Sequence, residues 1–285
     1  MHAPYDQHIV ECAHRKHFSP LRLFRGEHSR FRSRAQGRPG HQGKLNILHV
    51  SESGEGQWAD FPDERQTLER WHVLPPGSPR SAIPSLGIDV RKVLTQSDDP
   101  VAASLAYLER NPTDLIVLAT HQHDGHARWM AKAVGEPLAR QSHLMTLFIP
   151  AGVRGFVSAF DGSVSLERIL IPIASDPSPK PAIDAASRAA AALETDPVMF
   201  TTLHVADSDA GSALVVEPPP QGTWNRIVRS GEPAETILSV AAEQQADLIV
   251  MATQGRHGFL DGLRGSTTER VLRHTRCPLL AIPVS

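Results

Sequence analysis

The sequence predicts an α/β fold built from two tandem domains, each a doubly wound, Rossmann-like parallel sheet. Two observations lead to this prediction. Short apolar runs of strand type alternate with helical stretches, which is the pattern of a parallel sheet wound by right-handed crossovers. The pattern also occurs twice, because residues 114–120 (DLIVLAT) recur as residues 247–253 (DLIVMAT).

Further residues of the two copies match at the same sequence spacing as these runs. The matched pairs are Pro100 with Pro233, Gly125 with Gly258, Glu136 with Glu269, Arg140 with Arg273 and Pro150 with Pro283. Residues 47–50 (ILHV) also mirror residues 202–205 (TLHV), which places His49 and His204 at equivalent strand ends. We expect these two histidines to share a packing or hydrogen-bonding role. A constant spacing over this distance indicates a tandem duplication.

The second copy, residues 166–285, shows the alternation clearly. Strands are expected at residues 168–173, 198–205, 224–229, 248–252 and 279–284, and helices at residues 182–193, 233–245 and 268–274. Alanine and leucine dominate the first helix and lose little side-chain entropy in a helix. Leu248 to Ala252 is continuously apolar, as expected of a parallel strand that is buried on both faces.

The first copy, residues 45–151, follows the same plan with an added segment between Ser51 and Gly87. Prolines in that segment predict mostly loop, with a short helix within residues 61–71. The opening strand and helix of this copy belong before Lys44, where no residues identify them.

Two segments lie outside the copies. Residues 1–44 are rich in Arg and His and lack apolar periodicity, so we predict a divergent or disordered segment. Residues 152–165 form a connector, and its apolar residues predict packing between the halves rather than a free tether.

Composition favours a cytoplasmic globular protein without nucleic-acid or membrane partners. The chain is 40% hydrophobic, and its net charge of −2 gives no general attraction to nucleic acid or anionic membranes. Cys12 and Cys277 offer no disulfide framework, which fits a reducing compartment. No apolar run approaches the roughly 20 residues that span a bilayer, and no secretory signal is evident.

One loop carries the residue types that bind phosphate. It follows the strand at residues 248–252, contains Gly255 and Gly258, and ends at Gly265-Ser266, where a helix begins. Glycines let backbone N–H groups approach phosphate oxygens, and a helix N-terminus favours an anion. Open parallel sheets bind ligands at this carboxyl edge. A phosphate site is therefore one interpretation of the loop.

A capping box is the other interpretation. In the run 266–269 (STTE), Ser266 and Glu269 would satisfy exposed helix donors without any ligand. The loop matches neither the dinucleotide fingerprint nor the Gly-x-x-x-x-Gly-Lys loop. Spacing alone leaves both interpretations open.

The second copy as a whole resembles the universal stress protein family. Its nucleotide-binding members carry Gly-x-x-Gly, nine residues, then Gly-Ser or Gly-Thr; here Ala252 stands at the first glycine, followed by Gly255 and Gly265-Ser266. Residues 169–173 (ILIPI), 203–205 (LHV) and 277–283 (CPLLAIP) resemble the family's first, second and last strands. The resemblance covers nearly all of residues 166–285 and most of residues 45–150.

The resemblance implies the adenine nucleotide alpha hydrolase-like fold and an ATP site in the second copy. Adenine and ribose would lie near Ile173 and Val205. The phosphates would lie against the residues of the loop, and a divalent ion such as Mg²⁺ would accompany them. These loop residues are Ala252, Gly255, Gly265, Ser266 and Thr267.

This chain departs from the family pattern at several positions. Ala174 stands where binders carry an aspartate directly after the first strand, and Asp176 would replace it only if the turn is reshaped. In the first copy, Gln122, Lys132 and Ala133 stand at the positions of Gly255, Gly265 and Ser266. We therefore expect no ATP in the first copy.

Three functional hypotheses follow. The first is a stress-related, ATP-binding protein. It is expected to be regulatory rather than catalytic, because no catalytic base, no paired carboxylates and no metal cluster are evident. His121, His123 and His126 are interpreted as part of a solvated loop. The second is a scaffold or interaction protein without nucleotide. The third, an adenylating enzyme, requires a catalytic group that we do not find. Family members pair through their last strands, which implies either pairing of the two halves within the chain, residues 145–149 with 279–284, or a homodimer.

Overall fold

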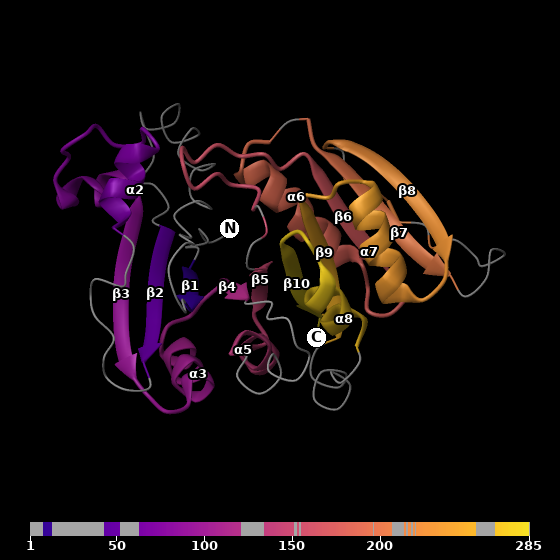
Figure 1. Cartoon of the computed structure of the whole chain (residues 1–285), viewed down its shortest axis with the longest axis horizontal. Coiled ribbons are helices and arrows are strands. Elements are labelled where there is room, and N and C mark those ends of the chain that lie inside the picture. The colour runs from indigo at the N-terminus through magenta and orange to yellow at the C-terminus, as the bar shows by residue number, and fades with distance from the viewer. Residues whose placement is uncertain are drawn as a thin grey trace, which may run out of the picture. The chain divides into compact units, whose positions relative to one another are not determined.

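The structure is a computed structural model of the chain (Figure 1). It describes residues 8–12, 43–51, 63–120, 134–150, 153, 155–195, 197–206, 214, 216–217, 219, 221–254 and 266–284. The chain divides into two compact units. Unit 1 comprises residues 1–119, 133–142 and 157–164, and unit 2 comprises residues 120–132, 143–156 and 165–285. The α/β fold predicted from the sequence is confirmed.

Within the described residues, four parallel strands form the sheet of unit 1, in the order β3-β2-β1-β4. Their bounds are β1 His8–Cys12, β2 Gly43–Ser51, β3 Ile88–Gln96 and β4 Leu115–Thr120. Sequence analysis did not find β1, which lies within the segment predicted to be divergent or disordered. The strand has only a short apolar stretch, but it pairs with β2 on one side and β4 on the other. Backbone pairing with two neighbours therefore outweighs its weak sequence signal.

Two helices of unit 1 follow the predicted alternation. They are α3, Pro100–Arg110, and α5, Gly135–Ser142, and they contact each other. Asp99 caps α3 by accepting a 2.9 Å hydrogen bond from the Ala102 N–H. Pro100 begins the helix, where a missing N–H costs nothing.

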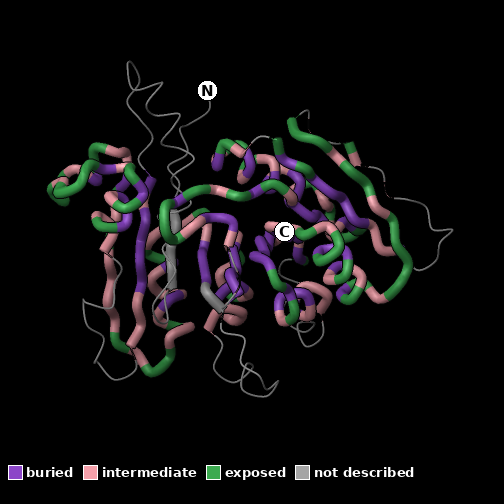
Figure 2. Tube along the Cα trace, turned by 45° about the horizontal axis from the view of Figure 1, so that its top comes forward, coloured by how far each residue is buried: buried purple, intermediate pink, exposed green. Residues whose placement is uncertain are grey.

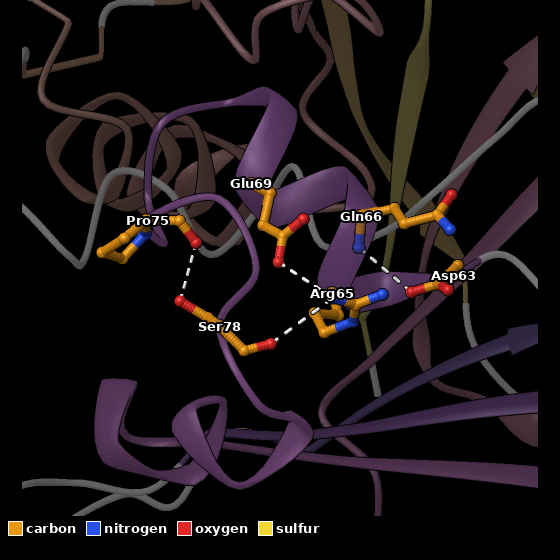
Figure 3. A network of polar contacts seen from close by, with 6 residues as sticks. All are labelled: Asp63, Arg65, Gln66, Glu69, Pro75 and Ser78. Carbon is orange, nitrogen blue, oxygen red and sulfur yellow. Dashed lines mark hydrogen bonds and ion pairs between the residues drawn. The ribbon is translucent and has the colours of Figure 1, made fainter.

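The described part of the added segment, residues 63–87, is loop interrupted by short helical elements, in agreement with the prediction. It contains α2, Glu64–Arg70, and the 3₁₀ turns η3, Arg80–Ala82, and η4, Pro84–Leu86. Figure 3 shows how side chains fix it: Arg65 donates to the Glu69 carboxylate at 3.1 Å and to the Ser78 carbonyl at 3.4 Å. The Ser78 hydroxyl in turn donates to the Pro75 carbonyl at 2.7 Å. The short helix predicted within residues 61–71 is confirmed.

Trp71 joins the added segment to part of the connector. Its side chain is 1% exposed, and its indole N–H donates to the Ala159 carbonyl at 3.2 Å. Gly162 lies directly against the ring, with a φ of +69°. A Cβ there would approach the Trp71 Cδ2 atom to 2.7 Å. Residues 157–164 of the connector thus pack within unit 1.

In the described part of unit 2, six strands form the sheet, in the order β5-β10-β9-β6-β7-β8. All neighbours are parallel except β5 and β10, which pair antiparallel with Leu279 opposite Phe148. The strands are β5 Met145–Pro150, β6 Arg168–Ile173, β7 Met199–Ala206, β8 Thr223–Ser230, β9 Leu248–Gln254 and β10 Leu279–Val284. The helices are α6 Lys180–Ala192, α7 Pro233–Glu243 and α8 Thr267–His274.

Buried side chains concentrate on the inner strands of unit 2. Figure 2 shows these strands as mainly buried, whereas the edge strand β8 is exposed along most of its length. Leu203 of β7 and Ile249 of β9 are fully buried, as are Ala182 and Ala186 of α6. Small alanine side chains let this helix approach the sheet closely, which explains its alanine-rich sequence.

Candidate functional site

The strand order of unit 2 creates a topological switch point between β6 and β9. From β6 the chain continues to β7 and β8 on one side, and it then crosses to β9 and β10 on the other. Between β6 and β9, only Ile169 with Leu248 and Leu170 with Ile249 are in register within the described residues. The carboxyl ends of these two strands therefore extend beyond their pairing. Ligands of open parallel sheets bind at such a point.

Three of the predicted site residues lie together at this carboxyl edge. Ile173 is the last residue of β6 and is buried, whereas Val205, near the end of β7, is half-buried. Ala252 of β9 is also half-buried and is in register with Ile282 of β10. Gly255 and Gly265 lie outside the described residues, as do Gln122, Lys132 and Ala133 of the first copy and the three histidines at 121, 123 and 126.

Ser266 and Thr267 begin α8, as predicted. Ser266 is the N-cap, and its hydroxyl oxygen accepts a 3.2 Å hydrogen bond from the Glu269 N–H. The serine half of the predicted capping box is therefore confirmed. A hydroxyl has two lone pairs and one proton, so this bond leaves the O–H proton able to donate. The capping and phosphate-binding interpretations of Ser266 are thus chemically compatible.

Asp176 lies near the end of β9 and is the first carboxylate after β6. The exposed residue Ala174 directly follows that strand, as the sequence indicates. Two residues later, the Asp176 carboxylate accepts a 2.8 Å hydrogen bond from the Gln254 side-chain amide. The turn after β6 therefore brings a carboxylate to the switch point. Sequence analysis missed Gln254 because its predicted strand ended two residues earlier.

His204 of β7 also lies at this edge, beside the end of β6. It is in register with Ile173, and its ring Nδ1 atom is 3.3 Å from the Ile173 carbonyl oxygen. The hydrogen-bonding role predicted for His204 is confirmed.

Charged residues tie α8 to α7 beside the site. Arg270 forms an ion pair with Glu232 and lies 3.7 Å from the Glu235 carboxylate. Glu232 is also the N-cap of α7 and accepts a 2.9 Å hydrogen bond from the Glu235 N–H. This backbone hydrogen bond, with smaller contributions from the Ala234 N–H and Arg270, holds the pKa of Glu232 below its ordinary value. The start of α8 is therefore held by the neighbouring helix.

Comparison with known proteins finds a family match for the C-terminal part of the chain. Residues 217–283 match the model of the universal stress protein family. This segment of the chain therefore resembles a universal stress protein domain. A universal stress protein of Methanocaldococcus jannaschii is 44% identical over 52 residues, which are 18% of this chain and 31% of that protein. Universal stress protein E of Escherichia coli is 42% identical over 55 residues, 19% of this chain and 17% of that protein. The matched segments thus span less than a third of these relatives.

Solved structures extend the likeness of fold to the whole chain. A universal stress protein from Archaeoglobus fulgidus has a TM-score of 0.61 at 16% identity, and the match covers 98% of this chain and 97% of that one. A Pseudomonas aeruginosa protein described as functionally unknown also has a TM-score of 0.61, at 14% identity, over 97% and 92% of the two chains. Both units thus have the fold of a universal stress protein. No helix in the described part of this chain has the length and apolar character needed to cross a membrane.

Proposed function

We propose that this chain is a universal stress protein, and specifically a cytoplasmic regulatory protein that binds ATP at the carboxyl edge of unit 2. One observation carries the proposal. The switch point gathers the apolar residues Ile173, Val205 and Ala252, and a serine-capped helix begins after the strand that carries Ala252. Apolar contacts suit a base, and helix N–H groups suit phosphate oxygens.

Different residues of this chain would contact the base, the sugar and the phosphates of the nucleotide. The base and sugar would contact Ile173 and Val205, and the phosphates would accept hydrogen bonds from the N–H groups at Gly255 and Gly265. The Ser266 hydroxyl and the Thr267 N–H would complete the phosphate contacts. Mg²⁺ bound with ATP would neutralise phosphate charge. We propose binding and signalling rather than catalysis, with association either of the two halves or of two chains.

Replacement of Gly265 by lysine, the residue of the first copy, is expected to abolish ATP binding. A side chain at this position would fill the space where backbone must approach phosphate. Isothermal titration with ATP and Mg²⁺ measures the effect, and AMP shows how far the phosphates contribute. Ala242→Lys is the matched control, because it adds the same charge to an exposed position at the end of α7. Lack of binding by the natural protein at millimolar ATP would refute the proposal.

Replacement of Ala174 by aspartate is expected to tighten ATP binding about tenfold. A carboxylate directly after β6 would accept hydrogen bonds from the ribose hydroxyls, and hydrogen bonds to a charged group are worth about 1.5–3 kcal/mol. Ser175→Asp is the control, since it adds the same charge one residue away at an exposed position. Equal affinities of the two variants would show that the added charge, and not its position, matters.

A scaffold function without nucleotide is the second candidate. The Ser266 hydroxyl oxygen accepts a hydrogen bond from the Glu269 N–H, and this capping role requires no ligand. Ala174 and Ala252 likewise stand where the family's binders carry aspartate and glycine. Titration of ATP separates the two candidates directly.

A further inference from the structure

A chain of polar contacts links the start of α8 to the start of α7 in unit 2. The Ser266 carbonyl oxygen accepts a 3.0 Å hydrogen bond from the Arg270 N–H, and the Arg270 guanidinium forms an ion pair with the Glu232 carboxylate. Glu232 is the N-cap of α7, where its other carboxylate oxygen accepts the hydrogen bond from the Glu235 N–H. Ser266, the N-cap of α8, is thereby connected through one arginine to the cap of the neighbouring helix.

The two carboxylate oxygens of Glu232 make separate contacts. One oxygen caps α7 and the other binds Arg270, so a single side chain provides both a helix cap and a link between helices. A second carboxylate, that of Glu235, lies 3.7 Å from the same guanidinium. Arginine suits this arrangement because its guanidinium presents several N–H donors in one plane. The Arg270 and Glu232 side chains are 38% and 37% exposed, so water and salt weaken the link but do not abolish it.

The first copy carries different residues at these two positions. Asp99 stands at the position of Glu232, and Pro137 stands at the position of Arg270. Asp99 caps α3 in the same way as Glu232 caps α7, but a proline side chain has no charge with which to form an ion pair. The cap is therefore common to both copies. The link made by Arg270 belongs to unit 2, the copy whose loop keeps the glycine and serine residues proposed to bind phosphate.

We propose that Glu232 and Arg270 are positioning residues for the phosphate end of the nucleotide site, because they fix the first turn of α8. The inference rests on the proposed function, since it assumes that a nucleotide occupies the carboxyl edge of unit 2. The free N–H groups of a helix start bind phosphate together only while the helix keeps its direction, so tilting of α8 would weaken these contacts. The residues assigned to the base and sugar come from β6 and β7, and a shift of α8 would leave them in place.

Glu232→Asp separates the link from the cap without changing the net charge. Aspartate is a good N-cap, as Asp99 of unit 1 shows, but it withdraws the carboxylate from Arg270 by about 1.5 Å, the length of one C–C bond. Because exposed ion pairs change an equilibrium by a factor of about 1.5 to 5, we expect the affinity for ATP with Mg²⁺ to fall about threefold in isothermal titration. Adenosine, which has no phosphate, should bind to the variant and to the natural protein equally well.

Asp99→Glu is the matched control, because it makes the reverse exchange at the equivalent cap of unit 1 and should leave ATP affinity unchanged. Equal losses of ATP and adenosine affinity in Glu232→Asp would indicate a general structural effect and overturn the inference. Unchanged or tighter ATP binding would also overturn it, since a released Arg270 would then serve the phosphates as well as a fixed one. The proposed function survives both of these outcomes. Failure of the natural protein to bind ATP overturns the proposed function and the inference together.

Amide hydrogen exchange of the free protein tests the link without any ligand. The Arg270 amide closes the first turn of α8, so it should exchange about threefold faster in Glu232→Asp than in the natural protein. The Ile183 amide, which donates to the Pro179 carbonyl at 3.1 Å, closes the first turn of α6 and should keep its rate. Equal rates for the Arg270 amide in the two proteins would show that the pair does not fix the helix start, and would overturn the inference whatever the titrations show.

Discussion

Replacement of Trp71 by alanine is expected to lower the free energy of unfolding of unit 1 by about 3–5 kcal/mol. The side chain is 1% exposed, and it connects α2 to residues 157–164 by packing and by the hydrogen bond to the Ala159 carbonyl. Truncation removes a large buried ring and leaves a cavity that the surrounding turns cannot fill by a simple shift. Urea unfolding followed by far-UV circular dichroism measures the loss.

Two companion variants identify the cause of that loss. Trp224 stacks on Phe200 at 4.5 Å but is only half-buried on the edge strand β8, so Trp224→Ala should cost clearly less than Trp71→Ala. Gly162→Ala should destabilise unit 1 without removing any atom, because its Cβ would meet the Trp71 ring at 2.7 Å. A Trp71→Ala variant as stable as the natural protein would contradict the assigned packing.

The strands and helices of unit 2 were predictable from the sequence because each one carries a local signal. Continuous apolar runs indicate the inner strands, and the alanine-rich run 182–193 indicates α6. The duplication strengthens the assignment, because the same apolar runs occur in both copies. Strand β1 lacked such a signal, because its five residues depend on neighbours that are distant in the sequence. Non-local pairing of this kind leaves little trace in a short run of residues.

The candidate site was predictable in part. Ile173, Val205 and Ala252 lie at one edge because the carboxyl ends of parallel strands lie together, which strand assignment alone implies. The hydrogen bonds at that edge were not predictable. The contact of Asp176 with Gln254 spans 78 positions, and that of His204 with Ile173 spans 31 positions. Such contacts depend on the path of the turn after each strand, which spacing does not specify.

Replacement of Glu269 by alanine is expected to cost about 3 kcal/mol of the stability of unit 2. The Glu269 side chain is only 2% exposed and forms an ion pair with Arg273 one turn later on α8. Removal of one partner of a buried pair leaves the other charge desolvated. Because the Arg273 side chain is 28% exposed, it can regain water, and the cost should lie at the low end of the range of about 3–5 kcal/mol for such pairs. Urea unfolding of unit 2 measures the cost.

The difference in exposure between Glu269 and Arg273 also predicts which of two further variants is less stable. Arg273→Met keeps an apolar stem and removes the positive charge that is paired with the almost fully buried Glu269 carboxylate. This variant should therefore be less stable than Glu269→Gln, which removes the buried charge and keeps an oxygen acceptor for Arg273. The double variant Glu269→Gln with Arg273→Met should be more stable than the sum of the two single losses predicts, because it leaves no buried charge unpaired. Equal losses of unfolding free energy in the two single variants would show that the pair is hydrated. The same residue types occur at Glu136 and Arg140 of the first copy, so the comparison can be repeated in unit 1.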